Sequence, residues 1–336
     1  MKKIENASLV DLNTFGIEAK AKLLIHYQSE NELIELIQSG LLQNEKVLHI
    51  GNGSNLLFLS DFDGIMLHSE LNFILVKSEI DEHVLIEVGA GVVWDDFVAY
   101  AVENGWGGIE NLSLIPGEVG ASAIQNIGAY GVEVCDTIME VHAINLLSGE
   151  KRIFSTNECE YDYRESIFKK SLKGQFAITS VLFKLTKKPN YKLDYQHLEE
   201  QVLKNGTLSL QNIRQTIIAV RESKLPDPKV AGNAGSFFMN PVISRTQFEK
   251  LQVEYPEMPH YFISSKSEKI PAAWLIDQCG WKGKTVGKAG VHDKQALVLV
   301  NRGGATGAEI AHLASLIQQS VKQKFGIDLT AEVNFI

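Results

Sequence analysis

Short apolar runs and amphipathic stretches alternate along the first hundred residues. Residues 22–27 (KLLIHY) and 46–50 (KVLHI) are apolar runs of strand length, and each predicts a buried strand. Between them, the apolar residues of 30–41 recur at helical spacing, which predicts a helix that ends near Gly40. Further strands are predicted at 64–68, 73–78 and 83–88, and a further helix at 94–104.

The rest of the chain continues this mixture. Residues 186–208 are polar and contain the turn signals KKPN and KNGT, so we predict a linker there. The chain is therefore predicted to combine helices and strands, with a domain boundary near residue 205. Strands are predicted at 138–145, 151–155, 176–185, 296–301 and 329–336, and helices at 210–221, 247–255, 272–279 and 307–325.

Two glycine-rich segments are candidates for holding a bound group. Gly51–Asn55 (GNGSN) follows a predicted strand, and its small residues can expose successive N–H groups as a nest for an anion. Residues 105–131 contain seven glycines and only two charged residues, Glu110 and Glu118, which favours backbone that approaches another group closely. Neither 51–56 nor 89–94 has the third glycine of the dinucleotide fingerprint. From the residues alone, a cofactor-binding loop and a glycine-rich core connection are both open.

Composition and charge exclude several classes of protein. The 336 residues are 45% hydrophobic and 22% charged, which is ordinary for a globular chain of about two domains. The net charge of −9 is a poor match for a nucleic-acid backbone. Three widely spaced cysteines, without a metal-ligand spacing, predict no metal site and a reducing compartment. With no apolar signal segment and no long apolar run, we expect a cytoplasmic monomer without a membrane partner.

Several motifs, taken in order, resemble one enzyme family. The first three are GNGSNLLF (51–58), GAGVVWDDFVAYA (89–101) and GGIENLSLIPGEVGASAIQNIGAYG (107–131). They resemble the flavin domain of the vanillyl-alcohol-oxidase type and, more closely, the UDP-N-acetylenolpyruvoylglucosamine reductase family, also called UDP-N-acetylmuramate dehydrogenases. The resemblance continues through YDYRESIFK, KLPDPKVAGNAGSFFMNP, AAWLIDQCGWKGKTVGKAGVHDKQALVLVN and AEVNFI, at 161–169, 224–241, 272–301 and 331–336. It therefore covers nearly the whole chain.

This resemblance implies an α+β fold with three parts. A two-subdomain FAD-binding domain of the PCMH type would be followed by a C-terminal α+β substrate-binding domain. The first FAD-binding subdomain is expected at 1–70, joined by the final strand at 329–336, and the second at 71–205. The substrate-binding domain is expected at 206–328. The polar segment around Tyr195 is similar to the tyrosine loop of the family's first structural type.

The resemblance also implies a reaction and its catalytic residues. NADPH would reduce bound FAD, and UDP-N-acetylglucosamine enolpyruvate would then accept a hydride and a proton to give UDP-N-acetylmuramate, a peptidoglycan precursor. Arg164 would offer a planar donor fork to the substrate carboxylate as charge develops. Ser236 would donate the proton, and Glu332 would polarise the enol or its water. Without the resemblance, Arg164 would be taken for a surface arginine and Ser236 for a turn hydroxyl.

The resemblance assigns the remaining site residues to binding of the cofactor or the substrate. Arg221 is a further candidate for binding the substrate nucleotide. Two positions depart from the family: Met239 stands where a basic residue is frequent, and Asn334 where some relatives have arginine. The resemblance therefore does not extend to a substrate-phosphate contact at Met239 or a flavin contact from Asn334. Cofactor binding is assigned to Gly51, Asn52, Gly53, Ser54, Asn55, Pro116, Gly117, Gln125, Asn126, Gly128, Ala129 and Tyr130. Substrate binding is assigned to Tyr195, Lys224, Asn240 and Gln295.

Two other functions remain open at this point. One is a flavin oxidase of the same superfamily that acts on an alcohol or hydroxy acid. It is disfavoured because the GNAGSFF and YRESIF motifs resemble the reductase, and because Gly51–Asn55 contains no His or Cys for covalent flavin attachment, although His49 lies just before it. The other is a non-catalytic flavin- or nucleotide-binding module.

Overall fold

The computed structural model describes residues 1–195 and 197–336, and internal contacts divide the chain into two compact units. Unit 1 comprises Met1–Ala7, Ala21–Asn52 and Asp63–Ser223. Unit 2 comprises Ser8–Lys20, Gly53–Phe62 and Lys224–Ile336.

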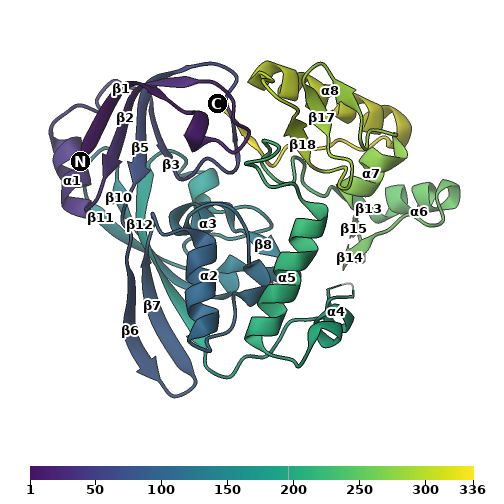
Figure 1. The fold of residues 1–336 in the computed structure, drawn as a ribbon, viewed down its shortest axis with the longest axis horizontal. Helices are drawn as coiled ribbons and strands as arrows, with labels where there is room; N and C mark the ends of the chain where they lie inside the picture. Colours follow the sequence, from purple (N-terminus) through teal and green to yellow (C-terminus); the bar gives the residue numbers. More distant parts are fainter. Residues whose placement is uncertain (196) are drawn as a thin grey trace. The chain divides into compact units, whose positions relative to one another are not determined.

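The first sheet of unit 1 has four strands in the order β1-β2-β5-β3 (Figure 1). The strands span Lys2–Ser8 (β1), Lys20–Tyr27 (β2), Phe62–Ser69 (β5) and Val47–Ile50 (β3), and β3 runs parallel to β5. Helix α1 (Glu30–Gln38) begins where the Ser29 hydroxyl accepts a hydrogen bond from the N–H of Glu32. Its apolar face buries Leu33, Leu36 and Ile37 in one core cluster with residues of β2 and β5.

The second sheet of unit 1 is antiparallel, in the order β11-β10-β12-β7-β6. Its strands span Lys151–Ser155, Ile138–Asn145, Phe176–Thr186, His83–Gly89 and Ile74–Ile80, in that order. Helices α2 (Trp94–Glu103) and α3 (Val119–Gln125) contribute to the core over this sheet, and α3 contacts β12. Trp94, Phe97 and Phe183 are fully buried there with ring centroids 4.8–6.1 Å apart. Burying such side chains stabilises the fold by about 1.5–3 kcal/mol each.

The predicted linker at 186–208 is wrong, because it contains helix α4 (Leu198–Asn205). Leu198 and Val202 of α4 pack with Ile213 and Ile217 of α5 (Leu210–Lys224) in a small separate cluster. Residues 206–223 belong to unit 1, which ends at Ser223, and the predicted domain boundary near residue 205 stays a prediction. The division of 1–205 into two flavin subdomains stays a prediction.

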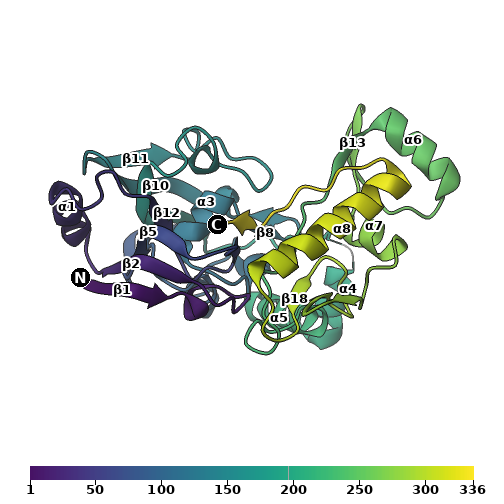
Figure 2. The ribbon, with the colours of Figure 1, turned by 90° about the horizontal axis from the view of Figure 1, so that it is seen from above.

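Unit 2 has three helices, each with small sheets beside it. Helix α8 (Gly307–Phe325) matches its predicted range and packs against α7 (Ala272–Gln278), β17 and β18 (Figure 2). A capping box between Thr306 and Glu309 starts it. Helix α6 spans Arg245–Glu254. The sheets are β13-β15-β14 (Val242–Ser244, Ser267–Lys269, Tyr261–Ser264) and β16-β17-β18 (Thr285–Val286, Ala289–Val291, Leu299–Asn301).

Short elements account for the other differences from the predicted pattern. The predicted strand at 329–336 is reduced to β19 (Asn334–Phe335), which pairs in parallel with β4 (Leu56–Leu57). The strand predicted at 296–301 begins only at Leu299, because 295–298 form a turn in which the N–H of Val298 donates to the carbonyl of Gln295. Strands β8 and β9 span Gly128–Ala129 and Val132–Glu133, and 3₁₀ helices span Val10–Leu12, Glu110–Leu112, Val134–Asp136 and Ile167–Lys169.

Candidate cofactor and substrate site

The first glycine-rich loop follows β3 and requires glycine at two positions. A Cβ on Gly51 would lie 2.8 Å from Oε2 of Glu118, within unit 1. Gly53, in unit 2, has φ +63°, and a Cβ there would lie 1.9 Å from the carbonyl oxygen of Leu12. Gly53 therefore has backbone that only glycine can form, whereas Gly51 lies against the end of the Glu118 side chain, and small residues at both positions fit a cradle where N–H groups meet a bound anion.

Within unit 2, the loop is bonded to the last strand of the chain. The amide of Asn55 donates to the carbonyl of Glu332 over 3.1 Å, and the N–H of Asn334 donates to the carbonyl of Asn55 over 3.0 Å. Pairing of β4 with β19 continues this contact. Asn55 and Glu332, predicted as a cofactor residue and a catalytic residue, are thus neighbours.

The later part of the glycine-rich segment 105–131, residues 116–131, is built around helix α3 in unit 1. Asn126 ends α3 in the left-handed conformation, with φ 48°. Its buried amide donates to Glu133 Oε2 and to the carbonyl of Asp162, and its oxygen accepts from the N–H of Cys135. The Asn126 side chain therefore holds the turn together, which leaves only its backbone for the predicted cofactor contact.

Arg164 lies against this same turn. Its guanidinium donates to the carbonyls of Gly128 and Asn126, the latter over 3.4 Å. Lys169 donates to the side-chain oxygen of Gln125 (3.0 Å) and to the carbonyl of Arg164 (2.7 Å). Arg164 itself has φ 57°, a strained conformation for arginine. The structure thus brings Gln125, Asn126, Gly128 and Arg164 together within unit 1.

A third group in unit 1 combines two tyrosines and an arginine. The rings of Tyr130 and Tyr195 meet edge to face with centroids 5.6 Å apart. Within residues 1–195 and 197–336, the buried Nε of Arg221 has no hydrogen-bond partner. Burial lowers the pKa of Arg221, and Tyr130 and Asp95 are the nearby groups that oppose this. A buried guanidinium nitrogen without an acceptor is a position where an anionic ligand would be favourable.

The carboxylate of Asp95 forms its ion pair with a different arginine, Arg214. Arg214 forms a bidentate pair with it, at 2.6 and 2.9 Å. Burial alone would raise the pKa of Asp95, but the bonds from Arg214 and from the N–H of Leu114 outweigh it, so that pKa is lowered. Asp95 is therefore ionised and held by Arg214.

Ser236 and Glu332 lie on adjacent segments of unit 2. The N–H of Glu332 donates to the carbonyl of Phe237 over 2.9 Å, and Phe238 bridges Ala331. Phe237 is fully buried, whereas Ser236 is exposed. In the described part of the chain, no side chain or backbone group hydrogen-bonds the Ser236 hydroxyl, so it is available to a ligand.

The predicted substrate residues of unit 2 have structural bonds of their own. Oδ1 of Asn240 accepts from the N–H of Ala272 at the start of α7, and Oε1 of Gln295 accepts from the N–H of Leu297. Lys224 is the last residue of α5. The carboxamide nitrogens of Asn240 and Gln295 are the atoms that could still donate to a ligand.

Sequence reasoning missed two residues beside the first loop, Glu118 and His68. Their side chains are bonded over 3.0 Å, and both are largely buried. Glu118 could have been noticed as one of only two charges in 105–131. Nothing in the sequence pairs it with His68, because 50 residues separate them.

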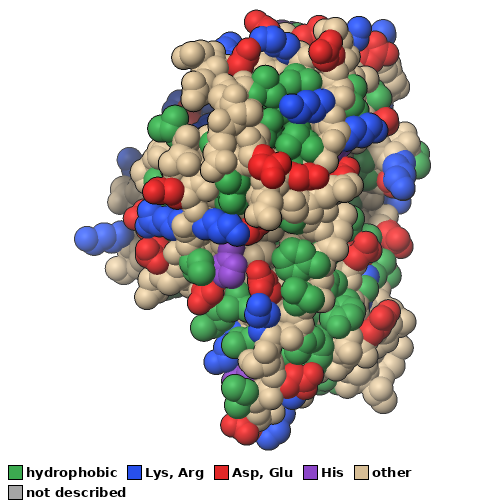
Figure 3. All heavy atoms as spheres, turned by 90° about the vertical axis from the view of Figure 1, so that its left-hand side faces the viewer, with side chains coloured by type: hydrophobic (Ala, Val, Ile, Leu, Met, Phe, Trp, Pro, Cys, Tyr) green, Lys and Arg blue, Asp and Glu red, His purple; other side chains and the backbone are tan. Residues whose placement is uncertain are grey.

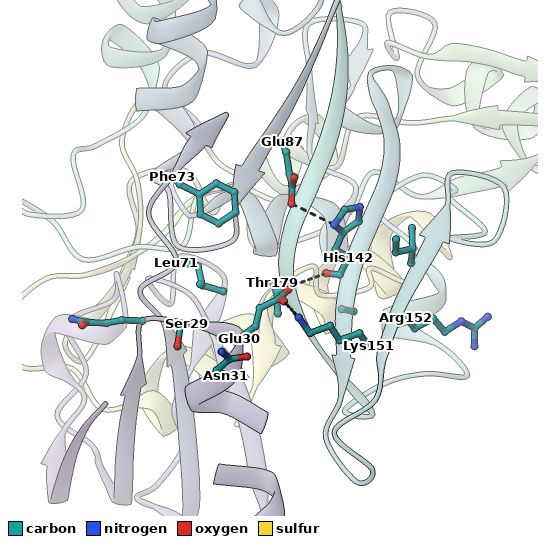
Figure 4. A pocket seen from close by; sticks show the side chains of 13 residues that line it. Ser29, Glu30, Asn31, Leu71, Phe73, Glu87, His142, Lys151, Arg152 and Thr179 are labelled. Carbon is teal, nitrogen blue, oxygen red and sulfur yellow. Dashed lines mark hydrogen bonds and ion pairs between the residues drawn. The ribbon is translucent and has the colours of Figure 1, made fainter. Parts of the chain in front are cut away.

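One cavity of about 480 Å³ in unit 1 lies away from these groups (Figure 4). Its polar side chains bond one another: Thr179 and Lys151 contact Glu30, and His142 lies 3.4 Å from Glu87. None of the predicted site residues lines it. This cavity therefore adds no member to the candidate site.

The described residues form neither a metal-binding cluster nor a membrane-spanning helix. Among residues 1–195 and 197–336, no group of three or more His, Cys, Asp or Glu side chains could hold a metal ion. No helix of the same residues is both long and apolar enough to cross a bilayer. On the face in Figure 3, acidic and basic side chains are interspersed, without a continuous basic band for nucleic acid.

Comparisons with known proteins assign the chain to a family. Residues 21–153 match the model of an FAD binding domain, and residues 227–336 match that of the UDP-N-acetylenolpyruvoylglucosamine reductase C-terminal domain. The crystal structure of UDP-N-acetylenolpyruvylglucosamine reductase from Thermus caldophilus is similar with a TM-score of 0.68, at 22% identity, over 99% of this chain and 98% of that one. This likeness confirms the α+β fold.

Curated relatives match over almost their whole length. The UDP-N-acetylenolpyruvoylglucosamine reductase of Bacteroides fragilis is 54% identical over 98% of both chains. Those of Porphyromonas gingivalis and Flavobacterium johnsoniae are 51% and 47% identical, over 96% and 98% of both chains. The chain therefore belongs to the UDP-N-acetylenolpyruvoylglucosamine reductase family of FAD-dependent oxidoreductases.

Proposed function

We propose that this chain reduces UDP-N-acetylglucosamine enolpyruvate to UDP-N-acetylmuramate, with FAD as bound cofactor and NADPH as reductant. The observation that carries the proposal is in unit 2, where the exposed Ser236 hydroxyl has no partner among residues 1–195 and 197–336, and the neighbouring Phe237 is bonded to the N–H of Glu332. Reduction of an enolpyruvyl ether needs one proton at carbon, and this hydroxyl can supply it. The relatives named above support the substrate.

The residues of the first loop fit the diphosphate of FAD. A side chain on Gly53 would collide with the carbonyl of Leu12, and the absence of side chains at Gly51 and Gly53 lets an anion approach the backbone N–H groups. When bound, FAD would supply the hydride chemistry. The protein would hold the cofactor through Gly51–Asn55 and the backbone of 116–130, including Pro116, Gly117 and Ala129.

Three residues would each act on a different part of the substrate: Arg164, Ser236 and Glu332. The bonds from Arg164 to the carbonyls of Asn126 and Gly128 orient its guanidinium plane. We propose that this plane binds the substrate carboxylate, whose charge grows as the enol forms. Ser236 gives its proton to the carbon that bears the ether oxygen, and Glu332 orients a donor or water at the enol.

Substrate binding is proposed for the tyrosine and arginine group and for unit 2. The unpartnered Nε of Arg221 supports an anion near Tyr130 and Tyr195 in unit 1. Lys224 would add a point charge for the nucleotide diphosphate. Asn240 and Gln295 would donate through their carboxamide nitrogens. The enzyme is proposed to act as a cytoplasmic monomer, and residues 206–328 to form most of its substrate-binding part.

Two half-reactions test this function. Under anaerobic conditions, NADPH should bleach the flavin absorbance of the purified protein, and the enolpyruvyl nucleotide should restore it. An oxidase would instead recover its absorbance rapidly with oxygen, and a binding module would show neither step. A colourless protein that takes up no FAD would contradict the proposal altogether.

A further inference from the structure

A chain of titratable side chains in unit 1 ends at the first glycine of the Gly51 loop. Nε2 of His68 is bonded to Oε1 of Glu118 over 3.0 Å, and Nδ1 of His68 lies 3.1 Å from Nδ1 of His26. His26 in turn lies 3.2 Å from the carboxylate of Glu70, which is partly exposed. The chain thus runs from solvent to Glu118.

The second carboxyl oxygen of Glu118 faces the loop. The side chain of Glu118 is only 5% exposed, yet Oε2 has no hydrogen-bond partner among residues 1–195 and 197–336. Oε2 lies 2.8 Å from the place where a Cβ of Gly51 would be. A carboxylate beside a loop that binds an anion repels that anion, whereas a neutral carboxylic acid does not.

Burial already favours the neutral form of Glu118. Its pKa is raised by burial, although the hydrogen bond from His68 opposes this. An anion bound at Gly51 would raise the same pKa further, because it disfavours a second negative charge nearby.

Two neighbouring groups, His49 and Tyr27, carry no charge near neutral pH. Burial lowers the pKa of His49 to about 4, so His49 is neutral above that pH. Burial raises the pKa of Tyr27, which bonds His49 over 2.7 Å and is likewise neutral. The charged or titratable groups around the chain are Lys2 from β1, His26 and Tyr27 from β2, Glu30 from α1, His49 from β3, and His68 and Glu70 from β5 and its end.

We propose that binding of the FAD diphosphate at the Gly51 loop is coupled to uptake of a proton by the Glu118 and His68 pair. This inference rests on the proposed function, since FAD is the anion concerned. The proton comes from solvent, and its presence on Glu118 removes the negative charge that faces the loop. Glu118 is thus a residue that sets flavin affinity without a role in the reduction itself.

Because FAD binding and protonation of Glu118 are thermodynamically linked, the direction of the pH dependence of FAD binding is fixed. Because the bound anion favours protonated Glu118, the dissociation constant of FAD rises with pH between the pKa of Glu118 in the free protein and its higher pKa in the complex. One proton allows at most about a tenfold rise per pH unit in that window. Outside that pH window, the affinity for FAD does not depend on the protonation of Glu118.

The test measures FAD binding to the flavin-free full chain from pH 5 to pH 9. Flavin fluorescence gives the dissociation constant, and calorimetry in buffers of different ionisation enthalpy gives the protons taken up. We expect the wild-type constant to rise at least about fivefold across the range, with uptake of up to one proton. Glu118→Gln keeps the shape and stays neutral, so its constant should vary less than about twofold and uptake should fall to near zero.

A second His and carboxylate pair provides the matched control. His142 and Glu87 lie 3.4 Å apart in unit 1 and line the cavity of Figure 4, and Glu87→Gln should bind FAD with the wild-type pH profile. His68→Leu removes the donor that stabilises ionised Glu118 and should move the midpoint of the pH dependence of FAD binding to higher pH. It also serves if Glu118→Gln does not fold.

The outcomes separate this inference from the function on which it rests. FAD binding without proton uptake in the wild type, or an unchanged pH profile in Glu118→Gln, overturns the coupling alone. A protein that binds no FAD at any pH contradicts the proposed function.

Discussion

At the scale of single residues, two glycines with the same backbone conformation differ in how closely other atoms approach them. Gly16 and Gly53 have nearly the same φ, +62° and +63°, and both belong to unit 2. Gly16 has nothing within 4 Å of a Cβ, whereas Gly53 faces the carbonyl of Leu12. Conformation and close approach can therefore be separated experimentally.

Gly53→Ala should destabilise the protein more than Gly16→Ala. The left-handed conformation costs alanine about 1–2 kcal/mol at either site. At Gly53, the collision with Leu12 should bring the loss in unfolding free energy to about 3 kcal/mol or more. Urea unfolding of the two variants measures the difference, and equal losses would mean that the loop relaxes without strain.

Ser236→Ala should separate the two half-reactions. The hydroxyl is needed only when the substrate carbon is protonated, so flavin bleaching by NADPH should keep its rate. Recovery of absorbance on adding the enolpyruvyl nucleotide should slow by about 10²–10⁴-fold, the usual loss for a positioned acid. Stopped-flow absorbance measures both steps. Ser236→Thr, which keeps a hydroxyl, is the control, and an equal slowing of both steps in Ser236→Ala would instead show a structural role.

At the scale of elements, sequence patterns succeeded where local signals agree with packing. Helix α8 was predicted at its observed bounds, because a capping box precedes it and Gly326 ends it with φ 66°. Helix α4 was missed because its sequence, LEEQVLKN, is mostly polar and its buried residues, Leu198 and Val202, pack mainly on α5. Strand β1 (KKIENAS) was missed because six of its seven residues are partly or fully exposed, so it lacks an apolar run.

Tyr195, between β12 and α5, and Lys224, the last residue of α5, should act in binding rather than in chemistry. Tyr195→Phe should raise KM for the enolpyruvyl nucleotide more than it lowers kcat, and Lys224→Ala at the end of α5 should do the same. Both substitutions remove contacts that bind the ground state and the transition state equally strongly. Steady-state kinetics with the nucleotide as the varied substrate measures this. Lys204→Ala, on the exposed part of α4, is a control, and a fall in kcat at constant KM would contradict the assignment.

At the scale of the whole molecule, the site residues are distributed over both units. Gln125, Asn126, Gly128 and Arg164 meet in unit 1, and Asn55, Ser236 and Glu332 meet in unit 2. Motif resemblance could identify these residues because each motif is continuous in sequence. It could not find the Glu118 and His68 pair, which forms only when β5 and the start of α3 meet in the folded chain.

We propose that Arg164 and Glu332 both act on one developing enolate. Residues that act as a unit are non-additive when removed. Arg164→Lys keeps the charge but loses the planar fork, so it should slow the substrate half-reaction strongly, as should Glu332→Gln. The double variant should be little slower than the slower single variant. Single-turnover recovery of flavin absorbance across the double-mutant cycle measures the coupling. If the free-energy losses add to within about 0.5 kcal/mol, the two residues act independently and the shared-enolate proposal is wrong.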